Sequence, residues 1–239
     1  MKLLFLGTRG NIEEKTRRHR RHSSLLVSYH DQRVMIDCGA DWRDEINELS
    51  PDAILITHAH PDHAWGLENG APCPVYATES AWKSMAAYPI EQRNILSVGN
   101  DETIENFQIT AYQLEHSTRA PAVGYRLVAG RATIFYAPDV VYIHQRQRAL
   151  QDIDAYIGDG ATVKQFFVRK RQDRLIGHTP IQTQLTWCRK EGVPRAVFTH
   201  CGSQIVGGDE RRIIPQIQNM AKKRNVRVDI AFDGMELIL

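Results

Sequence analysis

The sequence predicts one α/β domain over residues 1–239, and three observations support this class. Short apolar runs of strand length alternate with turn residues from the start of the chain. Helix-forming stretches are interspersed with these runs, and no linker-like segment interrupts them. With 42% hydrophobic residues, the chain is also long enough to bury a substantial core.

The expected elements follow in chain order. In the first half, strands are expected at residues 2–7, 24–29, 33–39 and 52–57, and residues 74–80 lead into an expected helical stretch at 81–88. Later strands are expected at residues 103–114, 124–128, 133–138, 155–159 and 195–200. Pro180 in a first turn predicts a helix over 180–190, and acidic residues at Asp209 and Glu210 predict another over 209–223. Residues 228–239 are expected to form a closing hairpin.

Charge and cysteine usage limit the class of protein. The net charge of +2 excludes the global positive field that is typical of general nucleic-acid binders. The four cysteines show no CxxC pairing and do not indicate a disulfide framework, so a reducing cytoplasm is expected. No signal-peptide core and no apolar run long enough to cross a bilayer is present, which predicts a cytoplasmic chain with no membrane partner.

The most informative segment has the sequence THAHPDH and directly follows an apolar strand. Alternate residues of an extended backbone face the same side, so His58 and His60 can hold one ion together. Pro61 then breaks the strand, which turns Asp62 and His63 toward a second position. Imidazole suits zinc and carboxylate tolerates manganese, so the segment predicts a metal site rather than a solvated loop.

Three further metal-competent side chains come just after other apolar runs: His116, Asp139 and His200. Metal sites in α/β proteins collect ligands from the ends of several strands, so these residues are expected to complete two ligand shells. The remaining histidines have no partner that the sequence identifies, and a surface position is expected for His19, His22, His30 and His144.

In motif, order and spacing, these residues resemble the metallo-β-lactamase superfamily along nearly the whole chain. The resemblance implies a four-layer αβ/βα sandwich with the site at one edge of two sheets. It also implies two divalent ions, zinc or manganese, that share an attacking hydroxide. The ligands it implies are His58, His60 and His116 on the first metal, Asp62, His63 and His200 on the second, and Asp139 bridging both.

Asp37 resembles the aspartate that this superfamily places behind the metal ligands. Its role would be to fix the tautomer of a ligand histidine. A structural aspartate at the end of a hairpin is the alternative.

The branch that contains ribonuclease Z and the cyclic phosphodiesterases of phosphonate metabolism is the most similar. Residues 116–126 resemble the stretch after the third histidine of that branch, and Gly177-His178-Thr179 resembles its Gly-His-Ser/Asn element. Asp159 lies where ribonuclease Z has an acidic partner for this histidine. Candidate catalytic roles therefore go to Asp62, His178 and Asp159. The basic run at 15–22 matches a phosphate-facing loop in position, or is a solvated surface.

Substrate size is the main open question. His116 and Asp139 are only 23 positions apart in the sequence, too close for the long arm with which tRNA-processing members hold tRNA. A small phosphodiester or cyclic phosphate is therefore favoured over nucleic acid. The alternatives are a thioester or lactone hydrolase of the glyoxalase II type, a tRNA- or RNA-processing nuclease, and a binding protein with a vestigial site. A homodimer is compatible with the sequence.

Overall fold

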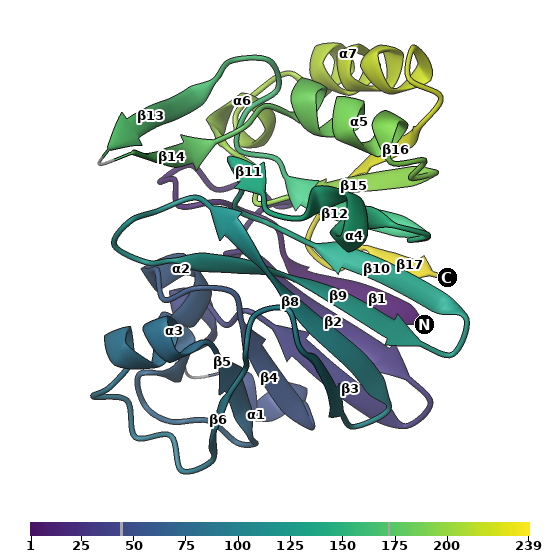
Figure 1. Ribbon diagram of the computed structural model, residues 1–239. Coiled ribbons are helices and arrows are strands. Elements are labelled where there is room, and N and C mark those ends of the chain that lie inside the picture. The colour runs from purple at the N-terminus through teal and green to yellow at the C-terminus, as the bar shows by residue number, and fades with distance from the viewer. Residues whose placement is uncertain (44, 172) are drawn as a thin grey trace.

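The computed structural model describes residues 1–43, 45–171 and 173–239, and most of its strands form two sheets that face each other (Figure 1). The strands of the first sheet are β1 (Lys2–Gly7), β2 (Ser24–Tyr29), β3 (Gln32–Ile36), β4 (Ala53–Ile56), β5 (Val75–Ala77), β6 (Arg93–Ile95) and β17 (Glu236–Ile238). They pair in the order β17–β1–β2–β3–β4–β5–β6, antiparallel as far as β3 and parallel from β3 to β6.

The second sheet contains the strands that carry the later candidate residues. They are β7 (Asp101–Ile104), β8 (Phe107–Glu115), β9 (Ala122–Ala129), β10 (Ala132–Tyr136), β11 (Tyr142–Ile143), β12 (Ala155–Asp159), β15 (Arg195–Thr199) and β16 (Arg227–Ile230). The order is β11–β8–β9–β10–β12–β15–β16, with β7 paired to β8. Strands β10, β12, β15 and β16 are parallel, so their carboxyl ends share one edge.

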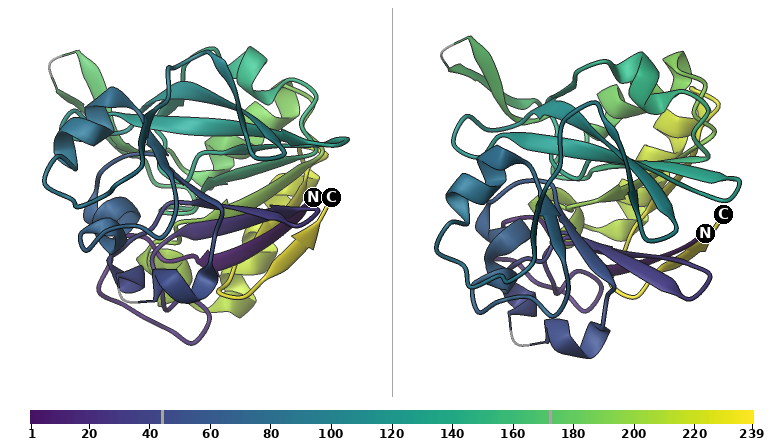
Figure 2. Two further views of the ribbon diagram at one scale, coloured as in Figure 1. Left: turned by 90° about the horizontal axis from the view of Figure 1, so that it is seen from below. Right: turned by 60° about the horizontal axis from the view of Figure 1, so that its bottom comes forward.

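Helices cover the outer face of each sheet, as the views in Figures 1 and 2 show. Beside the first sheet lie α1 (Ile46–Leu49), α2 (Pro61–Ala64), α3 (Glu79–Ser84) and two 3₁₀ turns, Ala40–Trp42 and Trp65–Leu67. Beside the second lie α4 (Arg146–Leu150), α5 (Ile181–Lys190), α6 (Ser203–Val206) and α7 (Glu210–Lys222). A separate two-stranded hairpin, β13 (Phe167–Arg171) and β14 (Arg174–His178), projects from the body.

Three apolar clusters separate these four layers. Alternation along β2 divides its side chains, because Leu25 and Val27 enter the cluster between the sheets whereas Leu26 faces the helices of the first sheet. Strand β4 is buried on both faces in the same way, which explains why its sequence is continuously apolar. The third cluster packs α5 and α7 on the second sheet. The four-layer αβ/βα sandwich expected from the sequence is therefore confirmed.

Two of the expected elements are wrong in detail. The closing segment is not a hairpin, because β16 pairs with β15 in the second sheet and β17 pairs with β1 in the first. The chain crosses between the sheets after Ile230, and the buried Ala231 packs between them. The expected strand at 103–114 is two strands, β7 and β8, which turn at Glu105 with φ 53°.

Other elements lay outside the sequence expectations. The hairpin of β13 and β14 follows no apolar alternation, since most of its residues are exposed.

None of the helices in the described ranges has the length and hydrophobicity needed to cross a membrane.

One buried hydrogen bond joins the two sheets beside the metal motif. The Tyr125 hydroxyl on β9 donates to the carbonyl oxygen of Ile56 on β4 at 2.7 Å. Tyr125→Phe keeps the ring in place and removes this donor, so we expect the free energy of unfolding to fall by about 1–2 kcal/mol. Denaturant titration measures the change. The control is Tyr142→Phe, whose side chain is 44% exposed. Equal stability of the two variants would show that the bond contributes nothing.

Candidate active site

The candidate residues lie at the ends of strands along one edge of the two sheets. His58 and His60 follow β4, and Asp62 and His63 lie on the short helix α2, where Pro61 occupies the first helical position. The others come from the second sheet and the hairpin: His116 after β8, Asp139 after β10, Asp159 at the end of β12, His178 at the end of β14, and His200 after β15. The structure thus brings together all nine residues that the sequence predicted for the site.

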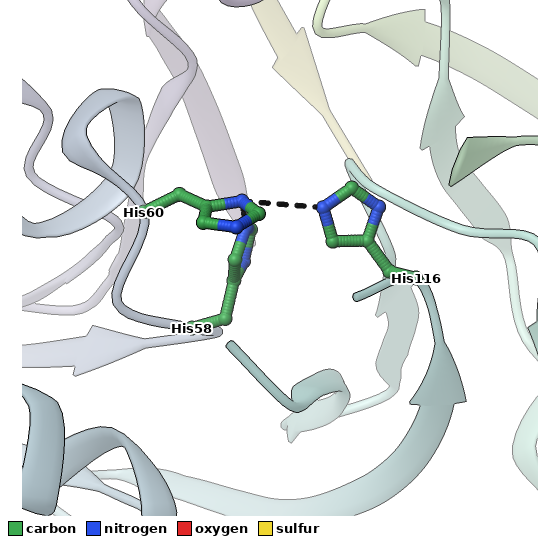
Figure 3. A group of neighbouring side chains, drawn as sticks. All are labelled: His58, His60 and His116. Atoms are coloured by element: carbon green, nitrogen blue, oxygen red, sulfur yellow. Dashed lines mark hydrogen bonds between the residues drawn. The ribbon is translucent and has the colours of Figure 1, made fainter. Parts of the chain in front are cut away.

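Three histidine rings converge on one point (Figure 3). His58 Nε2 lies 2.9 Å from His60 Nδ1, and His116 Nε2 lies 3.3 Å from the same His60 nitrogen. Tetrahedral zinc with Zn–N bonds of 2.0–2.1 Å separates its ligand nitrogens by about 3.3 Å. The spacing of the three nitrogens therefore suits a transition-metal ion.

A second group lies next to the first and contains two carboxylates. Asp62 Oδ2 is 3.3 Å from His63 Nε2 and 3.1 Å from His200 Nε2. Asp139 Oδ2 is 2.7 Å from His63 Nε2. A mixed set of imidazoles and carboxylates suits zinc or manganese.

Asp139 touches both groups. The same oxygen that faces His63 also lies 3.4 Å from His58 Nε2. Asp139 Oδ1, His63 Nε2 and His200 Nδ1 are buried, and among the described residues none of them forms a hydrogen bond of good geometry, although ion-pair partners lie within 3.2 Å of each. Buried polar atoms rarely lack well-aligned hydrogen bonds, so the orientation of these three atoms also fits a site for cations.

Asp37 lies behind both groups and orients two of the histidines. Its Oδ2 is 2.8 Å from His63 Nδ1, and its carboxylate accepts hydrogen bonds from the Thr57 amide at 2.8 Å and the Thr57 hydroxyl at 2.9 Å. The Thr57 hydroxyl in turn lies 3.1 Å from His58 Nδ1. With each Nδ1 occupied by a proton, Nε2 of both rings is free to face the site. This geometry supports the orienting role among the two alternatives for Asp37.

His116 is held from the hairpin side. Its Nδ1 lies 3.1 Å from the carbonyl oxygen of Gly177, and the Gly177 amide donates to the carbonyl oxygen of His116 at 2.9 Å. Gly177 has φ +115°, and a Cβ there would lie 1.7 Å from the carbonyl oxygen of Phe167. Only glycine fits this position, so a steric requirement explains why the Gly-His-Thr element begins with glycine.

His178 forms a pair with Asp159. Its Nδ1 lies 2.8 Å from Asp159 Oδ2 and 3.2 Å from Asp139 Oδ1. His178 and His200 line a cavity of about 230 Å³ together with the ring of Phe167. The His178 side chain is 24% exposed, so its ring can meet a ligand in that cavity.

Burial and charge give the two groups different protonation. Burial lowers the pKa of His58 well below its usual value and that of His116 to about 4, so both rings are neutral, as a metal ligand must be. Burial alone would also lower the pKa of His200, but Asp139 raises it to about 10. Cation binding at the second group therefore competes with protons.

His178 has a raised pKa. Burial opposes the shift, but the Asp159 carboxylate outweighs it through charge and its hydrogen bond. The pair therefore stabilises the protonated form of the ring.

The basic run at 15–22 is largely paired with acids. Arg18 lies 3.4 Å from Glu210, Arg21 pairs with Glu45, and His22 Nδ1 is 2.8 Å from Asp41. These contacts favour a structural role for the run over the phosphate-facing one. The surface position expected for His19 is wrong: its ring is buried and lies 2.8 Å from the Thr8 hydroxyl.

The family described as "Beta-lactamase superfamily domain" matches residues 32–201, and the chain belongs to this family. The chain is 31% identical over 141 residues to a ribonuclease Z of Methanopyrus kandleri, covering 52% of this chain and 48% of that protein. It is 26% identical over 141 residues to Exodeoxyribonuclease YycJ of Bacillus anthracis, covering 53% of each. The chain thus spans about half the length of these curated relatives.

Solved structures show the same fold over the whole chain. The metallo-β-lactamase fold protein YhfI from Bacillus subtilis superposes with a TM-score of 0.75 at 16% identity, covering 99% of this chain and 98% of that one. The family match over residues 32–201 confirms the expected superfamily, and the His and Asp clusters of the site are suited to metal ions.

Removing the negative charge of Asp37 tests its orienting role. Asp37→Asn keeps the size of the side chain but weakens its hold on Thr57 and His63, so we expect metal affinity to fall roughly 10- to 100-fold. Calorimetric titration of chelator-treated protein with Zn²⁺ measures it. Asp31→Asn, in the exposed turn between β2 and β3, is the control and should bind as wild type. Unchanged affinity in Asp37→Asn would assign this aspartate to the fold alone.

Proposed function

We propose that the chain is a dinuclear metal-dependent phosphodiesterase. The observation that carries this proposal is the His178–Asp159 pair, which borders a small cavity next to two groups of metal-competent side chains. A thioester or lactone hydrolase needs the two groups but has no use for such a pair. The names of the relatives, a ribonuclease and an exodeoxyribonuclease, support the same reaction class.

The proposed ligands divide between two ions that share Asp139. His58, His60 and His116 would hold the first ion, and Asp62, His63 and His200 the second. Zinc or manganese bound there would activate water and stabilise negative charge on the phosphate oxygens. Elemental analysis of protein purified without chelator should approach two ions per chain. Asp62 faces His63 and His200, so we assign it to the ligands rather than to proton transfer.

The proposed role of His178 is to neutralise the leaving group. Its Nδ1–H donates to Asp159, which leaves Nε2 as the atom that meets a ligand. With the pKa raised by Asp159, the protonated ring can donate from Nε2 to the alkoxide that forms when the bond to phosphorus breaks. Asp159 holds the ring in this orientation and is held itself by the Val140 amide at 3.0 Å.

A substrate panel tests the reaction class. The protein should hydrolyse bis(p-nitrophenyl) phosphate far faster than p-nitrophenyl phosphate, a β-lactam, a thioester or a lactone. The β-lactam, the thioester and the lactone have no phosphate oxygen for the cations, and the monoester shares the p-nitrophenolate leaving group but is not a diester. Rates should be compared at one metal content, determined by elemental analysis. Faster turnover of a thioester or lactone than of any diester would favour the glyoxalase II type.

His178→Ala should lower kcat for a diester with a poor leaving group by roughly 100- to 10,000-fold, the usual size of general acid catalysis. Both metals should stay bound, and the loss should shrink for p-nitrophenolate, which leaves without a proton. His144→Ala is the matched control, since His144 lies outside the site and pairs with Glu115 at 3.2 Å. Loss of metal from His178→Ala would make His178 a ligand, and unchanged kcat would make it structural.

A further inference from the structure

Strand β14 ends at His178, and the hairpin of β13 and β14 projects from the body of the protein (Figures 1 and 2). In its register, Phe167 pairs with His178, Arg169 with Ile176, and Arg171 with Arg174. Residues that pair directly, and every second residue along each strand, share one face. One face of the hairpin therefore leads from His178 past Arg169 to the two arginines nearest the tip.

This face borders a cavity that contains positive charge and no carboxylate. The cavity has a volume of about 460 Å³ and lies between the hairpin and the loop that follows His116. Its polar lining residues are Ser117, Thr118, Arg119, Arg169, Lys170 and Arg171, of which Arg169 and Arg171 belong to this face of the hairpin. Hydroxyls and guanidinium groups are donors that suit phosphate oxygens.

The cations on this face differ from those of the N-terminal basic run. In the described part of the chain, Arg119, Arg169, Arg171 and Arg174 form no ion pair with a carboxylate, whereas Lys170 lies 2.8 Å from Asp173. Unpaired arginines at successive same-face positions lie about 6.8 Å apart along β13. This separation is comparable with that of successive phosphates in an extended nucleic-acid strand.

Two exposed aromatic rings lie at the root of the hairpin. Phe166 is 62% exposed and Phe167 is 44% exposed, and the Phe167 ring also lines the cavity beside His178. Exposed rings next to a row of cations are the combination that single-stranded nucleic acids require, because bases stack on the rings while phosphates meet the cations.

We propose that the β13–β14 hairpin is a binding arm for single-stranded nucleic acid. Phosphates on one side of the scissile bond would lie along Arg169, Arg171 and Arg174, and a base next to that bond would stack at Phe166 or Phe167. The proposal rests on the proposed phosphodiesterase function and names its substrate class. It replaces the expectation of a small diester substrate. That expectation depended on the short segment between His116 and Asp139, and the sequence did not predict this hairpin.

Binding of a fluorescent 20-residue deoxythymidine strand with phosphorothioate links, which resists hydrolysis, tests the arm by anisotropy. Arg169→Glu/Arg171→Glu should weaken binding at least tenfold at 50 mM salt. It should also reduce the slope of log K against log salt by about 1.4, at about 0.7 per lost phosphate contact. The control with the same change of charge is Lys222→Glu/Lys223→Glu, at exposed positions at the end of α7. Equal effects of the two double variants, or no binding by wild type, would overturn the proposal.

Stacking is tested separately from charge. Phe166→Ala should weaken binding roughly 5- to 100-fold without changing the salt slope. Ile95→Ala is the control, because Ile95 on β6 is 63% exposed. Wild-type affinity in Phe166→Ala and Phe167→Ala together would remove the rings from the binding surface.

Hydrolysis of bis(p-nitrophenyl) phosphate separates this proposal from the proposed function. That substrate is too small to extend along the hairpin, so Arg169→Glu/Arg171→Glu should lower kcat/KM for an oligonucleotide by at least a tenfold larger factor than kcat/KM for bis(p-nitrophenyl) phosphate. Strand binding through the hairpin by a protein that hydrolyses no diester would support the arm and overturn the phosphodiesterase. Diester hydrolysis together with strand binding that the hairpin variants do not weaken would support the phosphodiesterase and overturn the arm.

Discussion

The buried carboxylate of Asp37 is the constraint on which the geometry of the site depends. It lies just after β3, accepts hydrogen bonds from the backbone and side chain of Thr57 at the end of β4, and orients His63 on the next helix. Burial raises the pKa of Asp37, while the charge of His63 and the hydrogen bonds from His63 and Thr57 oppose that shift. A charge at this depth is stable only with such partners, so the strand end, the turn and both imidazole orientations form one unit.

Much of the site could be predicted because its strongest signal is local. His58, His60, Asp62 and His63 lie within six residues, and strand periodicity with Pro61 is enough to divide them between two positions. The distant residues could be proposed because each follows an apolar run, and the carboxyl ends of neighbouring strands gather at one edge. The resemblance to a known superfamily then supplied the division of ligands, which no local pattern contains.

Features that depend on distant partners could not be predicted. Asp233-Gly234 looks like a hairpin turn, but the strands on either side of it pair in different sheets. The basic run forms ion pairs with acidic side chains distant in the sequence, such as the pair of Arg18 with Glu210. The β13–β14 hairpin has no apolar alternation because it packs against little, so its sequence resembled a loop. Its position beside His178 is set by the tertiary structure and has no local signal in the sequence.

Gly177, at the root of this hairpin, lies where the backbone geometry is fixed, whereas the length of the hairpin beyond it can vary. Both backbone groups of Gly177 are bonded to His116, and the next residue is His178, so the register at the root fixes both side chains at once. A slip by one residue would turn His178 to the opposite face. Beyond the pair of Arg171 and Arg174, added pairs of residues would lengthen the hairpin without moving the root. The length of the hairpin can therefore change during evolution while the positions of His116 and His178 stay the same.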